Sequence, residues 1–92
     1  MVQSLDMLRK AAARKKFVQR FRKTQGSVIA TAIRDSDKTQ RDVAEVVEMT
    51  EDSISEVVQG HRKTELGEIV SIAKAIDEDP EVLIRRMLNW HS

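Results

Sequence analysis

The stretch TQRDVAEVVEMTEDSISEVVQG, from Thr39 to Gly60, decides the fold of this chain. Thr39 and Thr50 each precede a short run in which apolar residues recur at helical spacing, and a threonine hydroxyl can accept a hydrogen bond from a free N–H of a first helical turn. These signals predict one helix over residues 40–47 and a second helix from residue 51 to Gly60. We therefore expect two short helices separated by a tight break.

Two helices joined by so short a break can cross steeply, as in a helix-turn-helix. This arrangement needs a small residue at the crossing, a short turn, and apolar residues on the second helix that face the first. Ala44 suits the crossing, Met49 can fill the turn, and Ile54 and Val57 form the facing pair. The stretch therefore predicts a helix-turn-helix unit.

The composition indicates one small helical domain. The chain has 92 residues, of which 40% are hydrophobic, and a domain of this size hides about 60 to 65% of its unfolded surface. Two phenylalanines, one tryptophan, one proline and three glycines among many helix-forming residues favour helices over strands. We expect an all-α fold with a single core.

The sequence also excludes several classes of protein. It contains no cysteine, so disulfides and thiolate metal sites are excluded. No apolar run approaches the roughly 20 residues that span a bilayer, and the N-terminus lacks the apolar segment of a secretory signal. We expect a soluble, cytoplasmic protein that does not act at a membrane.

Three more helices are expected around the unit. Gly26 interrupts the helical pattern before a helix placed at residues 27–35. Thr64 can cap a fourth helix, and Asp79 followed by Pro80 marks the start of a fifth, because proline is favoured at the first helical position. In the helix at residues 27–35, the apolar residues that recur at helical spacing are Val28, Ile29, Ala32 and Ile33. In the fourth helix, the residues expected to face inward are Leu66, Ile69, Val70, Ile72, Ala73 and Ile76. The residues that make the fifth helix apolar are Val82, Leu83, Ile84, Met87, Leu88 and Trp90.

Charge divides the chain in two. Residues 1–23 hold eight bases and one acid, a sum of +7, whereas residues 24–92 hold eight bases and fourteen acids, a sum of −6. Such asymmetry suggests an electrostatic partner for the basic part. We therefore divide the chain into a basic N-terminal helical arm, residues 1–26, and a helix-turn-helix domain, residues 27–92. The bases expected to act in the arm are Arg9, Lys10, Arg14, Lys15, Lys16 and Arg20.

The apolar residues of the arm form no single stripe. One group gathers on one side of a helical wheel, and a second group lies a quarter turn or more away. This pattern favours two short pieces or a bent helix, and it argues against a membrane-surface helix, which needs one sustained stripe. The first group is Leu5, Met7, Leu8, Ala11 and Ala12, and the second is Phe17, Val18 and Phe21.

Several positions agree in register with one known pattern. Thr39-Gln40 opens the unit where that pattern has Thr-Gln, and Val43-Ala44 stands at its Leu-Ala. Ile54-Ser55 stands at its Ile-Ser, and Gly60 ends the second helix at its glycine, with no insertion between. On these residues the chain resembles the lambda-repressor-like helix-turn-helix family of phage repressors and Cro proteins, over roughly residues 27–88.

The resemblance implies a bacterial or phage-encoded DNA-binding regulator associated with the nucleoid. It implies a homodimer that binds a two-fold operator, with the helix at residues 50–59 in the major groove of double-stranded DNA. The residues implied at base edges are Glu51, Asp52, Ser53 and Glu56. The residues implied at phosphates are Thr39, Gln40, Arg41, Thr50, Ser55, His61, Arg62, Lys63 and Thr64.

The chain departs from the family pattern in ways that bear on DNA binding. Glu48 stands where the turn usually has glycine, which implies backbone strain or an altered turn. Glu56 replaces a polar or basic residue, and Val58 replaces an acid, which suggests an extra buried or interface contact. Acids read a base edge only as acceptors, typically from cytosine N4, so the affinity for DNA must come from elsewhere, and the basic arm is the obvious source.

The last helix is unusually apolar, a pattern that fits completion of the core of one chain and fits a dimer contact at least as well at the end of so small a chain. The residues expected at that interface are Leu83, Met87, Leu88 and Trp90.

Two other functions remain open: a protein-interaction module of antitoxin-like or anti-repressor type, and non-specific nucleic-acid binding through the arm alone. We expect no enzyme, metal, cofactor or small-molecule substrate, because His61 and His91 lie far apart in sequence and neither sits in a metal-ligand pattern.

Overall fold

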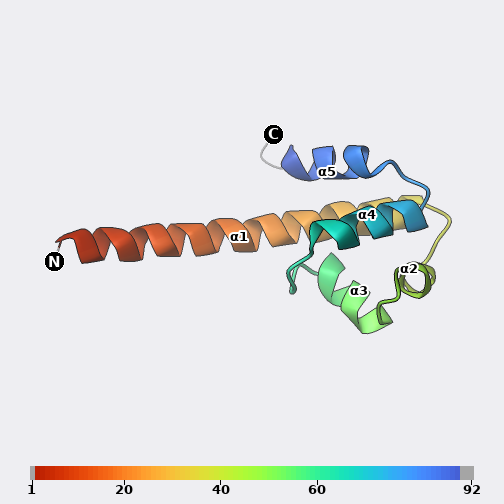
Figure 1. The fold of residues 1–92 in the computed structure, drawn as a ribbon, viewed down its shortest axis with the longest axis horizontal. Helices are drawn as coiled ribbons and strands as arrows, with labels where there is room; N and C mark the ends of the chain where they lie inside the picture. Colours follow the sequence, from red (N-terminus) through yellow and green to blue (C-terminus); the bar gives the residue numbers. More distant parts are fainter. Residues whose placement is uncertain (1, 90–92) are drawn as a thin grey trace.

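The computed structural model describes the backbone of residues 2–89 and the side chains of residues 9–89. All regular structure in this part of the chain is helical, which confirms the predicted all-α class. The helices are α1 (Val2–Asp35), α2 (Gln40–Val47), α3 (Glu51–Val58), α4 (Leu66–Ala75) and α5 (Pro80–Leu88) (Figure 1). The helix predicted over residues 40–47 is therefore confirmed, and the second helix ends two residues before the glycine that was expected to close it.

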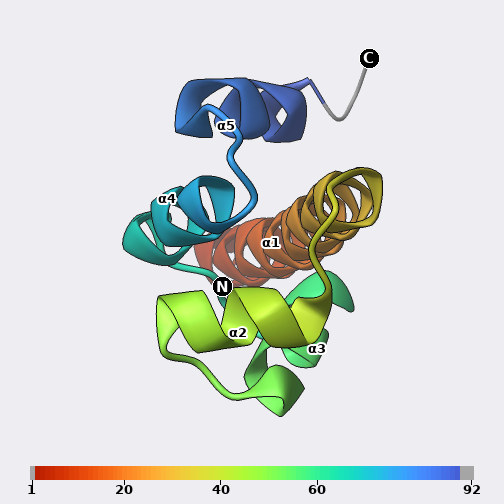
Figure 2. The same ribbon diagram turned by 90° about the vertical axis from the view of Figure 1, so that its right-hand side faces the viewer.

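The helices are arranged in three layers (Figure 2). α5 lies on one side, α1 and α4 lie in the middle, and α2 and α3 lie on the other side. The contacts agree, because α1 and α4 both pack against α5, α1 packs against α3, and α2 packs against α3 and α4. α1 has 34 residues and is about 51 Å long at 1.5 Å per residue. Its N-terminal half therefore projects well beyond the other helices (Figure 1).

The structure corrects the sequence prediction at Gly26. We expected a break there and two short pieces or a bent helix in the arm, but α1 runs without interruption through this residue. A glycine inside a helix costs only about 0.5–1 kcal/mol relative to alanine, which is too little to end a helix that packs against its neighbours. The division into an arm and a domain stays a prediction. The side chains of Leu5, Met7 and Leu8 lie outside the described residues.

Gly26 lies where α1 meets the end of α3. A Cβ atom at this position would lie 2.5 Å from the carbonyl oxygen of Val57 and 2.6 Å from that of Val58. Gly60 faces α1 in turn, since a Cβ atom there would lie 2.7 Å from the Cα atom of Lys23, and its φ of 73° is one that glycine adopts without strain. Two glycines therefore allow the backbones of α1 and α3 to approach closely.

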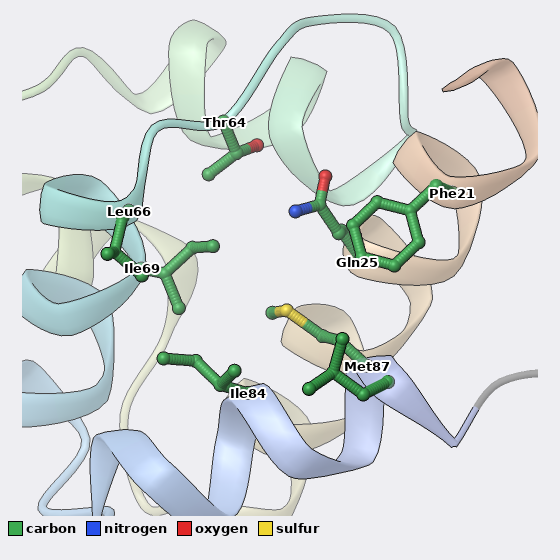
Figure 3. Close-up of a pocket in the computed structure, with 8 residues that line it drawn as sticks. Phe21, Gln25, Thr64, Leu66, Ile69, Ile84 and Met87 are labelled. Atoms are coloured by element: carbon green, nitrogen blue, oxygen red, sulfur yellow. The ribbon is translucent and has the colours of Figure 1, made fainter. Parts of the chain in front are cut away.

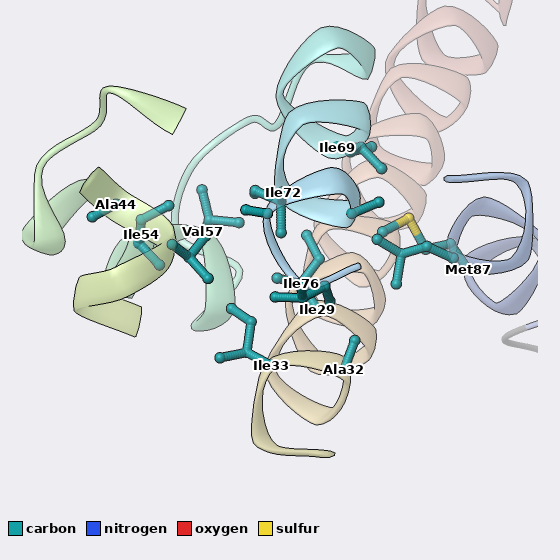
Figure 4. Packing of buried hydrophobic residues seen from close by; sticks show 14 residues of the cluster. Ile29, Ala32, Ile33, Ala44, Ile54, Val57, Ile69, Ile72, Ile76 and Met87 are labelled. Atoms are coloured by element: carbon teal, nitrogen blue, oxygen red, sulfur yellow. The ribbon is translucent and has the colours of Figure 1, made fainter. Parts of the chain in front are cut away.

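The core is built from apolar side chains of all five helices (Figure 4). Ile54 and Val57, the predicted facing pair of the helix-turn-helix, are both buried, as is Ala44 at the predicted crossing. The buried residues are Ile29, Ala32, Ile33, Val43, Ala44, Ile54, Val57, Ile69, Ile72, Ala73, Ala75, Ile76, Leu83 and Met87. These positions confirm the orientation predicted for the second helix of the unit.

One residue that was predicted to face inward is instead exposed. Leu66 is 64% exposed, because it starts α4 at the rim of an open groove that no helix covers. Val82 is 40% exposed, because α5 buries Leu83 and Met87, one turn apart, and Val82 points about 100° away from that pair. The prediction that Leu66 faces inward was therefore wrong, and Val82 leaves part of the apolar surface of α5 open to solvent.

Helix caps follow the sequence signals with one exception. Thr39, Thr50 and Asp79 are the N-caps of α2, α3 and α5, and each accepts a backbone N–H with its side chain. Thr64 was predicted to cap α4, but the N-cap is Glu65, whose N–H donates to the Glu68 carboxylate at 3.1 Å. The fourth helix therefore starts one residue later than a Thr64 cap would place it, because Glu68 offers an acceptor to the N–H of Glu65.

We predict that Gly26→Ala destabilises the protein and Gly67→Ala does not. The added methyl of Gly26→Ala would collide with the α3 backbone, which cannot rotate away as a side chain can, and such overpacking costs about 1–3 kcal/mol or more. Gly67 is also helical, and nothing lies within 4 Å of a Cβ atom there, so the same substitution should stabilise by up to about 1 kcal/mol. Urea unfolding measures both changes. Equal effects would mean that the contact between α1 and α3 is not tight.

Candidate nucleic-acid interface

The turn between α2 and α3 holds the two helices in their crossed arrangement. Glu48 has φ 58° and ψ 39°, the left-handed conformation in which glycine is favoured, so the strain implied by the sequence is present. The N–H groups of Glu48 and Met49 both bond to the carbonyl oxygen of Ala44. Met49 is half-buried against the core, in the position predicted for it. The turn is thus closed by backbone hydrogen bonds despite its unfavourable residue.

The outer face of α3 is acidic. Glu51, Asp52 and Glu56 are exposed, and Ser53 is half-buried, so the structure brings the four predicted base-reading residues onto one short helix. Asp52 and Glu56 are four residues apart and share one face. Residues 50–59 contain no base. This surface therefore presents carboxylates without a compensating cation of its own.

The hydroxyl groups around α3 are already engaged within the chain. The Thr50 hydroxyl accepts the N–H of Ser53 at 3.0 Å and donates to the Ser53 hydroxyl at 2.9 Å. The Ser55 hydroxyl accepts from the Gln59 amide at 3.0 Å. Thr39 forms a reciprocal capping box with Asp42. These contacts fix the helix starts. The Thr39 and Ser55 hydroxyls accept in these bonds and can still donate their O–H to a phosphate, whereas the O–H of Thr50 is already donated to Ser53.

The cations predicted to bind phosphate differ in how strongly they are already paired with acids of the chain. Arg62 pairs with Glu68 at 3.0 Å, and both side chains are mostly covered, so this guanidinium already has a partner. Arg41 is exposed and lies 4.0 Å from Glu45, a separation at which a surface pair contributes little. His61 and Lys63 are exposed in the loop after α3.

The two remaining residues predicted to bind phosphate lie in different parts of the structure. Gln40 is half-buried at the start of α2, whereas Thr64 lines the apolar groove beside α5. Few cations therefore stand near α3 to offset its acids.

The projecting half of α1 carries the largest group of bases. Every residue from 9 to 20 is exposed, so the predicted arm residues Arg9, Lys10, Arg14, Lys15, Lys16 and Arg20 all face solvent. Lys16, Arg20 and Lys23 line one shallow hollow on this helix. Arg9 lies seven residues before Lys16 and shares its side of the helix. We call Arg9, Lys16, Arg20 and Lys23 the basic stripe.

The residues predicted at the dimer interface differ in accessibility. Leu83 and Met87 are buried in the core of one chain, so a partner chain would contact the residues around them and not these two side chains. Leu88 is 57% exposed. Trp90 lies outside the described residues. The dimer contact through α5 stays a prediction, with Leu88 as its accessible residue.

Metal-binding clusters and membrane-spanning helices are both absent from the described residues. No cluster of three or more His, Asp or Glu side chains there is arranged to hold a metal ion. No helix of this part of the chain has the length and apolarity that crossing a bilayer requires.

Several solved structures are similar to the chain, and they include two regulatory proteins. The clp gene regulator ClgR from C. glutamicum superposes with a TM-score of 0.72 at 17% identity, over 78% of this chain and 94% of that one. The chain has the lambda-repressor-like helix-turn-helix fold. The restriction-modification controller protein C.AhdI from Aeromonas hydrophila superposes with a TM-score of 0.62 at 21% identity, over 66% of this chain and 92% of that one. No protein-family model matches the chain, and no curated protein matches it significantly.

Sequence reasoning missed one residue of the helix-turn-helix surface. Gln59, the C-cap of α3, is exposed and follows Glu56 by three residues, so it extends the face formed by Asp52 and Glu56. The spacing 52, 56, 59 was the signal that could have identified it. Its amide can donate and accept hydrogen bonds, which the two carboxylates cannot do.

We predict that the capping box of α2 makes stability depend on pH. Folding lowers the pKa of the Asp42 carboxyl below its usual 3.8, chiefly because the carboxylate accepts the Thr39 N–H and secondly because it interacts with the Thr39 side chain. A lowered pKa stabilises the folded state above the unfolded-state value, and this contribution is lost as pH falls through the folded value. The melting temperature should therefore fall less for Asp42→Asn than for wild type between about pH 5 and pH 2.

The control for this prediction is Asp37→Asn, which removes an equal charge from an exposed residue that caps no helix. The melting temperature of Asp37→Asn should change with pH as that of the wild type does. If both variants lose the same part of the pH dependence, general charge repulsion and not the cap would be its source.

Proposed function

We propose that this protein is a sequence-specific DNA-binding transcription regulator. It is bacterial or phage-encoded and acts as a homodimer on a two-fold operator, with α3 in the major groove. The observation that carries the proposal is the outer face of α3, which presents exposed polar groups. The fold that holds this helix is shared with two proteins described as a gene regulator and a controller protein. The proposed activity involves recognition and no catalysis.

Glu56 supports a recognition role because the fold does not require it. Its side chain makes no hydrogen bond or ion pair with any described residue. Asp52 is favoured in the first turn by the helix dipole, but Glu56 lies in the second turn, one turn from that like charge, where such a pair destabilises a helix by about 0.2–0.5 kcal/mol. A carboxylate held at this cost can accept a hydrogen bond from cytosine N4 at a base edge.

The affinity that α3 lacks is assigned to the arm. The sum of charge over residues 1–23 is +7, and all bases from residue 9 to residue 20 are exposed. Basic arms follow the DNA backbone or enter the minor groove. In this division of roles, the arm contributes sequence-independent attraction, and α3 contributes selection between sites.

The experiment for the proposed function is selection of bound duplexes from a random pool, followed by the same selection with Glu56→Gln. Wild type should enrich one two-fold sequence, and Glu56→Gln should change the preferred base at one position in each half-site, because an amide can donate as well as accept. Glu81→Gln is the matched control, since it removes an equal charge from an exposed residue of α5. Recovery of no preferred sequence would overturn the proposal and favour the protein-interaction module.

We also predict which bases of the arm set the salt dependence. Replacing Arg9, Lys16 and Arg20 of the basic stripe by Gln should lower the slope of log affinity against log salt by roughly 2–3, at about 0.9 for each phosphate contact. The enriched sequence should stay the same, because α3 is unchanged.

The control for the salt test is the triple variant Lys10→Gln, Arg14→Gln, Lys15→Gln, which removes the same charge from other sides of α1 and should change the slope less. Equal losses for the two triple variants would show that the arm attracts DNA without a defined face. Unchanged slopes for both would show that the arm does not meet DNA.

A further inference from the structure

An open apolar groove lies between α1, the start of α4 and α5. Figure 3 shows side chains from these three helices and the loop before α4 surrounding one space. The groove has a volume of about 280 Å³ and is lined by Phe21, Gln25, Thr64, Leu66, Ile69, Ile84, Met87 and Leu88. Its rim is accessible, because Leu66 and Leu88 are 64% and 57% exposed. An apolar rim of this kind indicates a contact with another surface.

The same side of α1 continues past the groove onto the arm. Residues at alternating spacings of four and three form one seam along the helix, which runs through Ala11, Arg14, Val18, Phe21, Gln25, Val28 and Ala32. Toward its C-terminal end the seam is covered, since Ala32 is buried and Val28 packs against the core. Toward its N-terminal end it is open, and Val18 is 42% exposed. Phe17, which stacks on Phe21 and is 55% exposed, widens it.

We propose that the groove is the docking site for the arm of a second copy of this chain, which rests on the homodimer of the proposed function. The open part of one copy's seam, centred on Val18, packs against Leu66 and Leu88 of the other copy. The two α1 helices then run antiparallel, and each arm lies on the body of its partner. The contact is isologous, because each copy gives one arm and one groove.

Charge selects the arm of a second copy as the occupant. The arm sums to +7 and the rest of the chain to −6, so an arm on a partner's body brings opposite charges together. A contact between two arms alone would bring eight bases against eight.

This dimer leaves the proposed DNA contacts accessible. On a helical wheel, Arg9, Lys16 and Arg20 of the basic stripe lie about 160–180° from Val18, so they face away from the docked side. α3 packs on α1 through Gly26, which lies about 80° from Val18 on the other flank of the helix from Phe21. One side of α1 therefore serves the partner while the opposite side remains free for phosphates.

Cysteine cross-linking tests the proposal in the full chain, which has no native cysteine. Val18→Cys protein carrying a size tag is mixed with untagged Leu88→Cys protein in a thiol–disulfide redox buffer, and products are separated by mass. A disulfide forms only where two Cα atoms approach to about 4.4–6.8 Å, so the expected product is the mixed 18–88 disulfide between copies. Lys16→Cys, on the basic stripe, is the matched control and should give at least tenfold less product with Leu88→Cys.

The remaining outcomes overturn the proposal in distinguishable ways. A dominant 88–88 product from Leu88→Cys alone would show that two α5 helices meet, and a dominant 18–18 product would show an arm-to-arm dimer. Absence of any product, together with a monomer mass in sedimentation at high micromolar concentration, would show that the groove takes no second copy. Duplex selection with the same variants under reducing conditions tests the proposed function separately, since sequence preference that survives without the 18–88 product would refute only the docking.

Discussion

The fold depends on one close backbone contact, the approach of Gly26 in α1 to the end of α3. α3 has eight residues, which is too few for an independently stable helix in water, so packing must determine its position. Ile54 and Val57 bury one face, but apolar side chains alone tolerate sliding. The glycine contact fixes the end of α3 against α1 at backbone distance, while the Thr50 cap fixes its start. The outer face of α3 is therefore held in a defined direction, as any reader of base edges requires.

The sequence predicted the local parts of this fold well and the long-range parts poorly. Caps at Thr39, Thr50 and Asp79 and the buried pair of α3 follow from neighbours within one or two helical turns, and the structure confirmed them. Gly26 was misread as a break because local propensity cannot show that another backbone lies beside it. The exposure of Leu66 depends on where α5 ends over α4, and Thr64 lost its capping role to a hydrogen bond between Glu65 and Glu68. The same holds for the candidate site: its exposed acids could be predicted from local sequence, but the ion pair between Arg62 and Glu68, six residues apart, could not.

α1 links the two proposals because its sides have different chemistry. Its C-terminal half belongs to the core through Ile29, Ala32 and Ile33. Its projecting half has no core to join, and most of the stability of helices in proteins comes from packing, so a partner that covers one side would stabilise it. A dimer that orders the arm would also hold the basic stripe in place before DNA is met, which lowers the ordering cost of binding. Dimer assembly and DNA affinity would then be coupled through a single helix.

An acidic reading helix changes how selectivity arises in the proposed function. A carboxylate brought into the major groove loses water and meets a negative potential, so every site without a suitably placed donor is penalised. Cytosine N4 supplies that donor, and only a matching site compensates the penalty. The attraction of the arm acts on all sites alike, because phosphates carry no sequence information. Affinity and selectivity would therefore reside in different elements, and Glu56, which the fold does not need, could change the preferred sequence while the core and the arm stay as they are.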